Sequence, residues 1–484
     1  MNSRVLFFIL CVAVPLAALV WLVDKEFAPR GIWEAKTGFA KPSNVIRILD
    51  DASFIKEAGK HLLSVPGQSV SLEIENSHTF LSARLVALWR TNADVVEMGV
   101  LARKDPPLTK MKVVYHRALE ALSWKKTAPD SEDRVLWQKN DTFQTIQDFS
   151  RAAIPAEKVL AVNTEYAPPL ELEGYTPRRD PRRYDVSLRG PQTIFFYSGG
   201  EEMQWKFVAQ DMNRHDGADE VGMRILGRDG HIVFEDHLAD DGEIWGSGRP
   251  GKLREMIWKG VLPAGVYRLE LQASDDIFFR RMETAAQKFV FQYVVYLADT
   301  SGFRAVSPAV KLYGRANSLS LRTPHAEGVQ TVAVEGIPVA VLKANQSYPV
   351  ETRESLTEIA VPTPDLKIDF DGFFTFSSDA FFLPKSIGFS DLEHAERFGA
   401  EYVLAKDYHP FRVGDFVRGS AEISLKDIDQ TGSLVVVMAQ KGGKTDRWQV
   451  DDLHVTLLRD PLDFFRLREM LSVRMKALFQ RFSL

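Results

Sequence analysis

Oxygen-bearing side chains gather in the stretch DMNRHDGADE, residues 211–220, which lies between two runs with the alternation of strands. Calcium prefers six to eight oxygen ligands, and loops supply them from Asp, Asn and backbone carbonyls. The spacing departs from the EF-hand pattern, because one additional residue separates Asn213 from the following Asp-Gly pair. Two interpretations stay open: a solvated loop with Asx-turns, or a structural cation site for which calcium is the expected ion. The candidate ligands are Asp211, Asn213, Asp216 and Asp219.

A second polar stretch, ADDGEIWGSGRPG (residues 239–251), has the composition of a sugar-binding loop. Sugar binding uses an aromatic ring against C–H faces and polar groups that orient the hydroxyls. Trp245 is the candidate ring, and packing inside the protein is the alternative role for its side chain. Acidic residues of this loop complete the cation site if the two loops share one end of a sandwich. The candidate polar contacts around Trp245 are Asp241, Glu243 and Arg249.

Motifs of common enzyme classes are missing from the sequence. The chain has no HExxH, no G-x-S-x-G elbow and no Walker or dinucleotide glycine motif after a strand. Paired carboxylates such as Asp275-Asp276 do occur, and a glycosidase needs only two acids a few ångströms apart. The sequence therefore leaves enzyme activity undecided and favours a protein without it.

Composition and charge exclude some partners. The chain has 484 residues, of which 45% are hydrophobic and 26% charged, a globular composition with room for about three domains. The formal net charge of -5 offers no basic field for nucleic acid, so no nucleic-acid partner is expected. The single cysteine, Cys11, lies in the N-terminal apolar run, which leaves the folded body without thiols for disulfides or zinc.

The two chain ends differ from the rest of the sequence. No charged residue occurs from Val5 to Val23, and this length matches the roughly 17–25 residues of a membrane-spanning helix. We expect a signal anchor, with a cleaved signal peptide as the alternative, and a body outside the cytoplasm. Residues 460–484 are expected to form an amphipathic helix that docks on its own domain, on a membrane surface or in a protein partner.

Between these ends the apolar residues recur mainly at every second position. Val70, Leu72 and Ile74 alternate with polar residues, as in a half-buried strand, and Asp229-Gly230 is typical of a hairpin turn. We therefore predict a mostly β fold of tandem, jelly-roll-like sandwiches. The expected divisions are an anchor at 1–30, a juxtamembrane helical segment at 31–66, a sandwich at 67–174, a linker at 175–184, a sandwich at 185–300, a third sandwich with a preceding small β region at 301–459, and the helix at 460–484.

The region around the two polar stretches resembles a known module. Its order is a strand in MQWKFVAQ, an acidic turn, a hairpin in VGMRILGRDGHIVFEDHL, a Gly-rich loop and a strand in AGVYRLEL. Residues 205–273 in this order resemble the bacterial pre-peptidase C-terminal type of β-sandwich and related jelly-roll binding modules. The resemblance implies an extracellular accessory fold and no particular reaction.

Together these features predict a membrane-anchored protein of the cell envelope, periplasmic or on the cell surface. Its modules are expected to bind or organise surface polysaccharide or partner proteins. One alternative is a glycan-active hydrolase or lyase that uses loop carboxylates. The other is a structural subunit of an envelope complex that assembles through its terminal helices. The sequence specifies neither the ligand nor the oligomeric state.

Overall fold

Strands make up most of the folded chain. The computed structural model describes Val14 and residues 31–461, without 38, 40–45, 51, 58–59, 76–78, 103–107, 169–171, 173–174, 179, 215–218, 241–249, 299–308, 427, 429–432 and 443–446. The predicted mostly β class is confirmed. Within residues 31–461 the α-helices are short: α2 (Arg117–Ala121), α3 (Ile146–Arg151) and α4 (Leu392–Arg397), with 3₁₀ turns η1 (Ala156–Lys158), η2 (Ala326–Gly328) and η3 (Ser378–Ala380).

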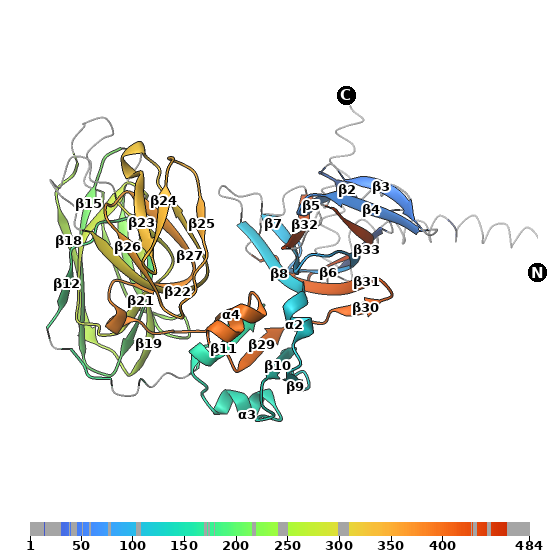
Figure 1. The fold of residues 1–484 in the computed structure, drawn as a ribbon, viewed down its shortest axis with the longest axis horizontal. Helices are drawn as coiled ribbons and strands as arrows, with labels where there is room; N and C mark the ends of the chain where they lie inside the picture. The colour runs from blue at the N-terminus through green and yellow to red at the C-terminus, as the bar shows by residue number, and fades with distance from the viewer. Residues whose placement is uncertain are drawn as a thin grey trace, which may run out of the picture. The chain divides into compact units, whose positions relative to one another are not determined.

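The described residues divide into two compact units (Figure 1). The first combines residues 1–123, 132–134 and 405–484, as far as they are described, and the second contains 124–131 and 135–404. The first unit is therefore assembled from both ends of the chain, and the second is an insertion between them.

The first unit contains two sheets, which we call the terminal sandwich. One sheet has the order β3-β4-β33-β6-β31-β30, with β1 on β33, and the other has the order β2-β5-β32-β7-β8. The strands of the first sheet are β1 (Ile32–Thr37), β3 (Ser53–Glu57), β4 (Lys60–Pro66), β6 (Ser82–Arg90), β30 (Phe411–Val413), β31 (Phe416–Ser424) and β33 (Arg447–Leu458). Those of the second are β2 (Ile46–Ile48), β5 (Ser69–Glu75), β7 (Val95–Ala102), β8 (Leu108–His116) and β32 (Ser433–Lys441).

Alternation along these strands builds one core between the two sheets. Val70, Leu72 and Ile74 of β5 are fully buried, and Trp89 of β6 and Trp448 of β33 pack into the same cluster. In sequence order β4, β6, β31 and β33 belong to one sheet while β5, β7, β8 and β32 belong to the other. Such repeated passage between two facing sheets is the arrangement of a jelly roll.

The predicted helical segment at 31–66 is wrong, because the described residues of this range form β1 to β4 and no helix. Ile46 of β2 lies opposite Ile74 of β5, and Leu63 of β4 lies opposite Val450 of β33. The apolar residues of the segment fit a helical stripe as well as a strand face. Pairing with β5 and β33 decides between them, because it satisfies the backbone polar groups and buries Ile46 and Leu63 in the core.

The expected order of three successive sandwiches also differs from the structure. β32 lies between β5 and β7, and β33 pairs with both β4 and β6. The C-terminal strands therefore complete the N-terminal sandwich, and neither 67–174 nor 301–459 is a compact unit. Sequence periodicity locates strands but does not specify partners that are more than 300 residues apart.

The second unit contains a large sheet that runs without a break through two regions. Its main path has the order β17-β16-β19-β14-β21-β27-β22-β26-β23-β24. A second layer, β18-β15-β20 with β12 and β13, faces the first part of this path, and we call residues 182–297 the central sandwich. Its strands are β12 (Arg182–Tyr184), β13 (Leu188–Arg189), β14 (Gln192–Ser198), β15 (Glu202–Asp211), β16 (Val221–Leu226), β17 (Ile232–Leu238), β18 (Arg254–Val261), β19 (Gly265–Gln272), β20 (Ile277–Thr284) and β21 (Phe289–Leu297).

The remaining strands continue this sheet or form a smaller one. Pairing of β21 with β27 joins the central sandwich to the following region, and both contribute to one hydrophobic core. That region contains β22 (Val310–Arg322), β23 (Gln330–Val334), β24 (Ile337–Val341), β25 (Tyr348–Val350), β26 (Thr357–Val361) and β27 (Leu366–Thr375). The smaller sheet, ordered β28-β11-β29-β10-β9, contains β9 (Lys125–Lys126), β10 (Arg134–Gln138), β11 (Val159–Val162), β28 (Ile387–Gly388) and β29 (Tyr402–Lys406).

Several local predictions are confirmed in the central sandwich. β16 and β17 form the predicted hairpin, and β15 and β19 are strands as expected. Trp205 and Trp258 are buried in the core. The segment at 175–184, by contrast, is not a free linker: β12 pairs with β20, and Arg182 bonds to Ser377.

The predicted terminal segments lie largely outside the residues that the structure describes. The expected anchor at 1–30 is described only at Val14, and the expected helix at 460–484 only at its first two residues. Among the residues that are described, no helix has the length and apolar character needed to cross a membrane.

The arrangement of strands predicts how fragments of the chain behave. A fragment of residues 31–174 lacks β31, β32 and β33, so we expect it to stay unfolded in circular dichroism and denaturant titration. A fragment of residues 124–404 retains its own core and is expected to unfold cooperatively. Cooperative unfolding of the 31–174 fragment would contradict the assignment of the closing strands.

Helix α4 holds a buried histidine whose neutral state is required by its surroundings. The side chain of Asp391 caps the helix by accepting the backbone N–H of His394, and the His394 side chain is buried. Arg397 Nη2 lies 3.1 Å from His394 Nδ1, and an arginine can only donate, so Nδ1 accepts. Burial, together with the charge of Arg397, lowers the pKa of His394 to about 4.

This histidine predicts acid sensitivity of the second unit. Because the pKa of His394 is about 4 in the folded chain and near its ordinary 6.5 when unfolded, protonation favours unfolding. Stability should fall as the pH drops from about 6.5 to 4, by up to roughly 3 kcal/mol. In His394→Gln this part of the pH dependence should disappear from chemical denaturation curves. Identical pH slopes for the variant and the parent would contradict it.

Candidate functional site

An open cleft of about 880 Å³ lies on the second unit. It is bounded by β14, β19 and the turn between β16 and β17, and by residues 165–168 and 384–385. This volume lies in the range of ligand-binding clefts, roughly 300–1,000 Å³. Aromatic and charged side chains both line it.

The hairpin turn at Gly227–His231 places polar side chains at the rim of the cleft. The N–H of Gly227 donates to the carbonyl of His231 at 2.9 Å, and the N–H of Gly230 donates to that of Gly227 at 3.0 Å. Gly230 has φ +83°, a left-handed conformation that favours glycine. Asp229 accepts hydrogen bonds from the backbone and ring of His231, and they lower the pKa of Asp229. The turn thereby fixes Arg228, Asp229 and His231 on one rim.

Aromatic side chains form one wall of the cleft. Phe195 and Tyr197 are two residues apart on β14 and share its outer face, while Phe196 between them points into the core. Tyr267, opposite Phe196 on β19, stacks on it with ring centroids 5.7 Å apart, so its ring packs on the core face of the sheet, away from Phe195 and Tyr197. Its hydroxyl donates to the carbonyl of Pro263 at 2.9 Å. The wall is therefore held rigidly by strand pairing and core contacts.

Ion pairs balance most of the charged groups near the cleft. Lys385 Nζ lies 2.6 Å from Glu165 and 5.7 Å from the ring centroid of Phe195. Arg268 Nε lies 3.0 Å from Glu270. The cleft thus presents aromatic rings beside ordered charged groups.

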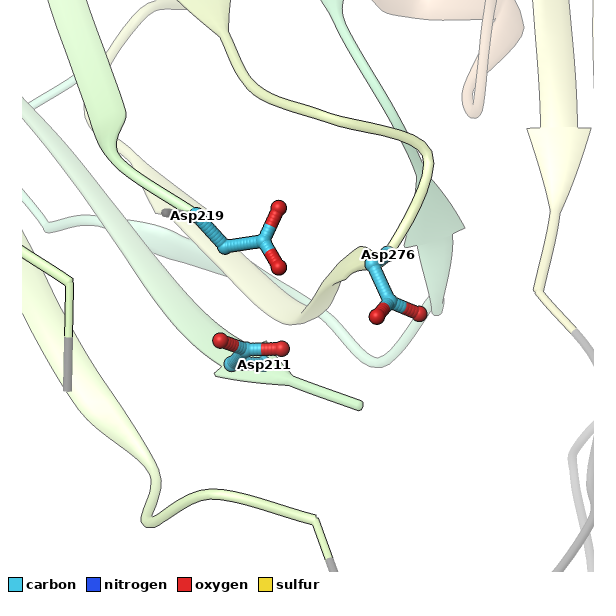
Figure 2. Close-up of side chains that lie close together, drawn as sticks. All are labelled: Asp211, Asp219 and Asp276. Atoms are coloured by element: carbon cyan, nitrogen blue, oxygen red, sulfur yellow. The ribbon is translucent and has the colours of Figure 1, made fainter. Parts of the chain in front are cut away.

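A cluster of three carboxylates lies at the opposite end of β16. Asp211 ends β15, Asp219 precedes β16 and Asp276 precedes β20. One oxygen of each lies within 4.8 Å of those of the other two, and Figure 2 shows the three carboxylates facing a common space. Pairing of β15 with β20 explains the approach, because Asp211 is opposite Ile277.

Backbone and side-chain donors orient these carboxylates. The N–H of Asn213 donates to Asp211 at 2.8 Å, and that of Arg214 donates to Asp276. Ser274 Oγ donates to Asp219. Asp211 and Asp276 are buried, and Asp219 is half-buried. The cluster therefore has a fixed geometry and little access for a large ligand.

The structure brings part of the predicted cation site together. Asp211 and Asp219 of the stretch at 211–220 approach each other as a shared site requires. The backbone N–H of Asn213 donates a hydrogen bond to the carboxylate of Asp211. Asp216 lies outside the described residues. Asp276 was missed as a partner, because only the pairing of β15 with β20 places it there.

The key residues of the predicted sugar-binding loop lie outside the residues that the structure describes: Asp241, Glu243, Trp245 and Arg249. One described contact joins the two polar loops, as expected if they share an end of the sandwich. The carboxylate of Asp240 accepts a hydrogen bond from the N–H of Asp219 at 3.1 Å. The cleft itself was not predicted. The only sequence signal for it is the turn Gly-Arg-Asp-Gly-His beside a Phe-Phe-Tyr strand.

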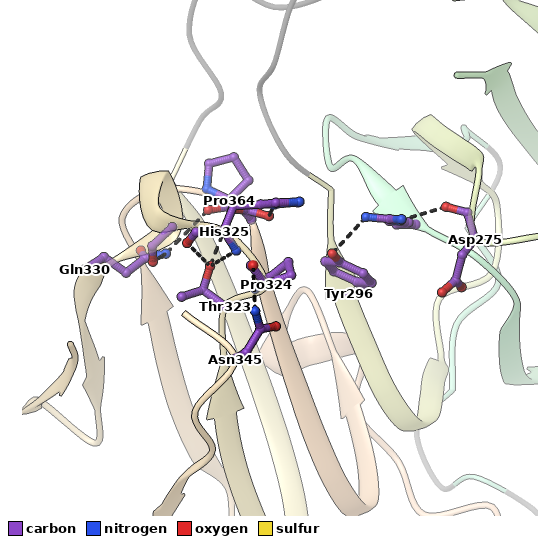
Figure 3. Close-up of polar contacts among 11 residues, drawn as sticks. Asp275, Tyr296, Thr323, Pro324, His325, Gln330, Asn345 and Pro364 are labelled. Atoms are coloured by element: carbon purple, nitrogen blue, oxygen red, sulfur yellow. Dashed lines mark hydrogen bonds and ion pairs between the residues drawn. The ribbon is translucent and has the colours of Figure 1, made fainter. Parts of the chain in front are cut away.

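A threonine, a histidine and an aspartate meet near β22 and β27, but their order does not suit catalysis. Thr323 Oγ1 lies 3.4 Å from Asp365, and His325 Nδ1 lies 2.9 Å from the same carboxylate. Figure 3 shows Thr323 and His325 close together. A nucleophile needs the base on its own hydroxyl, whereas here the carboxylate stands between the two. Thr323 also donates to the carbonyl of His325 at 3.0 Å, so the group closes a turn.

Comparisons with known proteins identify no family for the chain. No family model matches it, and no curated protein is significantly similar. Among solved structures, dimeric latent PorU from Porphyromonas gingivalis aligns at 11% identity and a TM-score of 0.15, over 68% of this chain and 34% of that chain. A structure of infectious bursal disease virus Gt strain aligns at 9% identity and a TM-score of 0.14, over 89% of this chain and 80% of that chain. A structure that shows the triple jelly roll fold and turret assembly in an archaeal virus aligns at 8% identity and a TM-score of 0.16, over 68% of this chain and 90% of that chain.

These TM-scores are too low to support an argument about fold or function. The resemblance of residues 205–273 to pre-peptidase C-terminal modules stays a prediction.

Proposed function

We propose that this chain is a non-enzymatic glycan-binding protein of the cell envelope that binds a polysaccharide segment in the cleft of the second unit. The observation that carries the proposal is the wall of Phe195 and Tyr197 beside the polar rim of Arg228, Asp229 and His231. Aromatic faces contact the C–H groups of sugar rings, and the rim offers donors and acceptors for hydroxyls. The anchor and the location outside the cytoplasm rest on the apolar run at Val5–Val23.

The carboxylates at the cleft do not support the alternative of a glycan hydrolase. A glycosidase needs one acid with a raised pKa that can protonate the leaving oxygen. Hydrogen bonds from His231 instead lower the pKa of Asp229, and Glu165 is ion-paired with Lys385. The acidic cluster of Asp211, Asp219 and Asp276 is too buried to receive a sugar. Binding without turnover is therefore the function that the cleft supports best.

Glycan binding through the aromatic wall predicts the effect of truncating it. Phe195→Ala should weaken polysaccharide binding about tenfold, the equivalent of about 1.4 kcal/mol for a lost aromatic contact. Tyr293→Ala, which removes an exposed tyrosine outside the cleft, should leave affinity unchanged. Affinity is measured by calorimetry or co-sedimentation, and melting temperatures verify folding. Equal affinities for a folded Phe195→Ala variant and the parent would refute this role for the wall.

We also propose that the acidic cluster holds a structural calcium ion. Three carboxylates from three segments supply hard oxygen ligands, and Asn213, backbone carbonyls and water would complete the six to eight that calcium prefers. A bound ion would fix the loops at this end without touching the cleft ligand.

Calcium binding predicts a shift in stability. At a calcium concentration about 100 times Kd, the free energy of unfolding should rise by about 2.7 kcal/mol, and chelator should remove the gain. Asp276→Asn should abolish this response, whereas Asp275→Asn, the same change at an exposed neighbour, should keep it. Denaturant titration with calcium and with chelator measures the difference. A parent protein whose stability does not change with calcium would show that hydrogen bonds alone maintain the cluster.

A further inference from the structure

Arg228 differs from the other cations that line the cleft. Lys385 is paired with Glu165, and Arg268 is paired with Glu270. His231 is engaged with Asp229. Among the residues that the structure describes, no carboxylate forms an ion pair with Arg228. Its charge is therefore the one at this rim that a ligand can neutralise.

The guanidinium of Arg228 is held in place by the backbone on both sides of the cleft. Its own backbone lies in the turn that Gly227 and Gly230 close, and its Nη2 donates to the carbonyl of Ala167. Ala167 also lines the cleft, so the side chain extends from the hairpin towards the opposite rim. A guanidinium has five N–H donors, of which this bond uses one, and the others remain for a ligand.

Such a group suits an anionic ligand better than a neutral one. A guanidinium binds a carboxylate through two parallel, charge-assisted hydrogen bonds, whereas a sugar hydroxyl offers it only a single neutral acceptor. Arg228 shares the cleft with the aromatic wall of Phe195 and Tyr197. One sugar ring on that wall and a carboxylate at the rim would satisfy both features together.

We infer that the cleft is selective for acidic polysaccharide, and that Arg228 binds the carboxylate of a uronic acid unit while the aromatic wall contacts the sugar rings. This inference rests on the proposed glycan-binding function and specifies its ligand class. Arg228 is the residue that sets specificity, and the aromatic wall contributes affinity for any sugar.

The test compares two ligands that differ only in charge. The full chain, purified in detergent, is titrated with short oligomers of galacturonic acid and with their methyl esters, at one fixed calcium concentration. The acid is expected to bind about tenfold more tightly than the ester, with an advantage that shrinks as salt rises. Arg228→Gln should remove this advantage and leave the affinity for the ester unchanged.

A matched variant controls for net charge. Arg353→Gln removes the same charge from an exposed position outside the cleft and should keep the preference for the acid. Equal binding of acid and ester by the parent would overturn the inference about acidic ligands but not the proposed glycan binding. The same would follow if Arg228→Gln and Arg353→Gln changed the preference for the acid equally. Absence of binding to either oligomer would overturn the inference, and failure of neutral glycans to bind as well would overturn the proposed function.

Discussion

The pairing of β32 and β33 with strands near the beginning of the chain is the interaction on which the first unit depends. β32 lies in the middle of one sheet and β33 in the middle of the other. Trp448 of β33 fills the core beside Trp89 of β6, so the hydrophobic gain of closing the sandwich comes only when the last strands arrive. The second unit has its own core between these segments, which lowers the entropic cost of bringing distant strands together because a folded insertion spans the gap.

Within the second unit, one strand links the two features of functional interest. β16 begins just after Asp219 of the acidic cluster and ends at the turn that carries Arg228. Six residues of strand span about 20 Å, so the two sites are separated by the length of the sandwich. Strand pairing on both sides of β16 makes this spacing rigid. The acidic cluster can therefore stabilise one end of the sandwich without taking part in ligand contact at the other.

Local patterns in the sequence predicted local structure well. Alternation located β5, the β16–β17 hairpin and β19. The segment before residue 66 was misassigned because its apolar spacing suits a helix and a strand alike, and the deciding partners are distant. Asp276 and the cleft were missed for the same reason. Each depends on strand neighbours, which contiguous sequence does not specify.

Both ends of the described chain meet at one point of the terminal sandwich. Ile32 of β1 lies opposite Leu458 of β33, and the N–H of Arg459 donates to the carbonyl of Gly31 at 2.8 Å. Gly31 has φ +78°, and a side chain there would collide with the carbonyl of Arg459. The mechanical consequence follows from the antiparallel pairing of β1 and β33. Pulling the two termini apart would open this pair like a zipper, one hydrogen bond after another, whereas attaching both to one surface would put no opposing force across it.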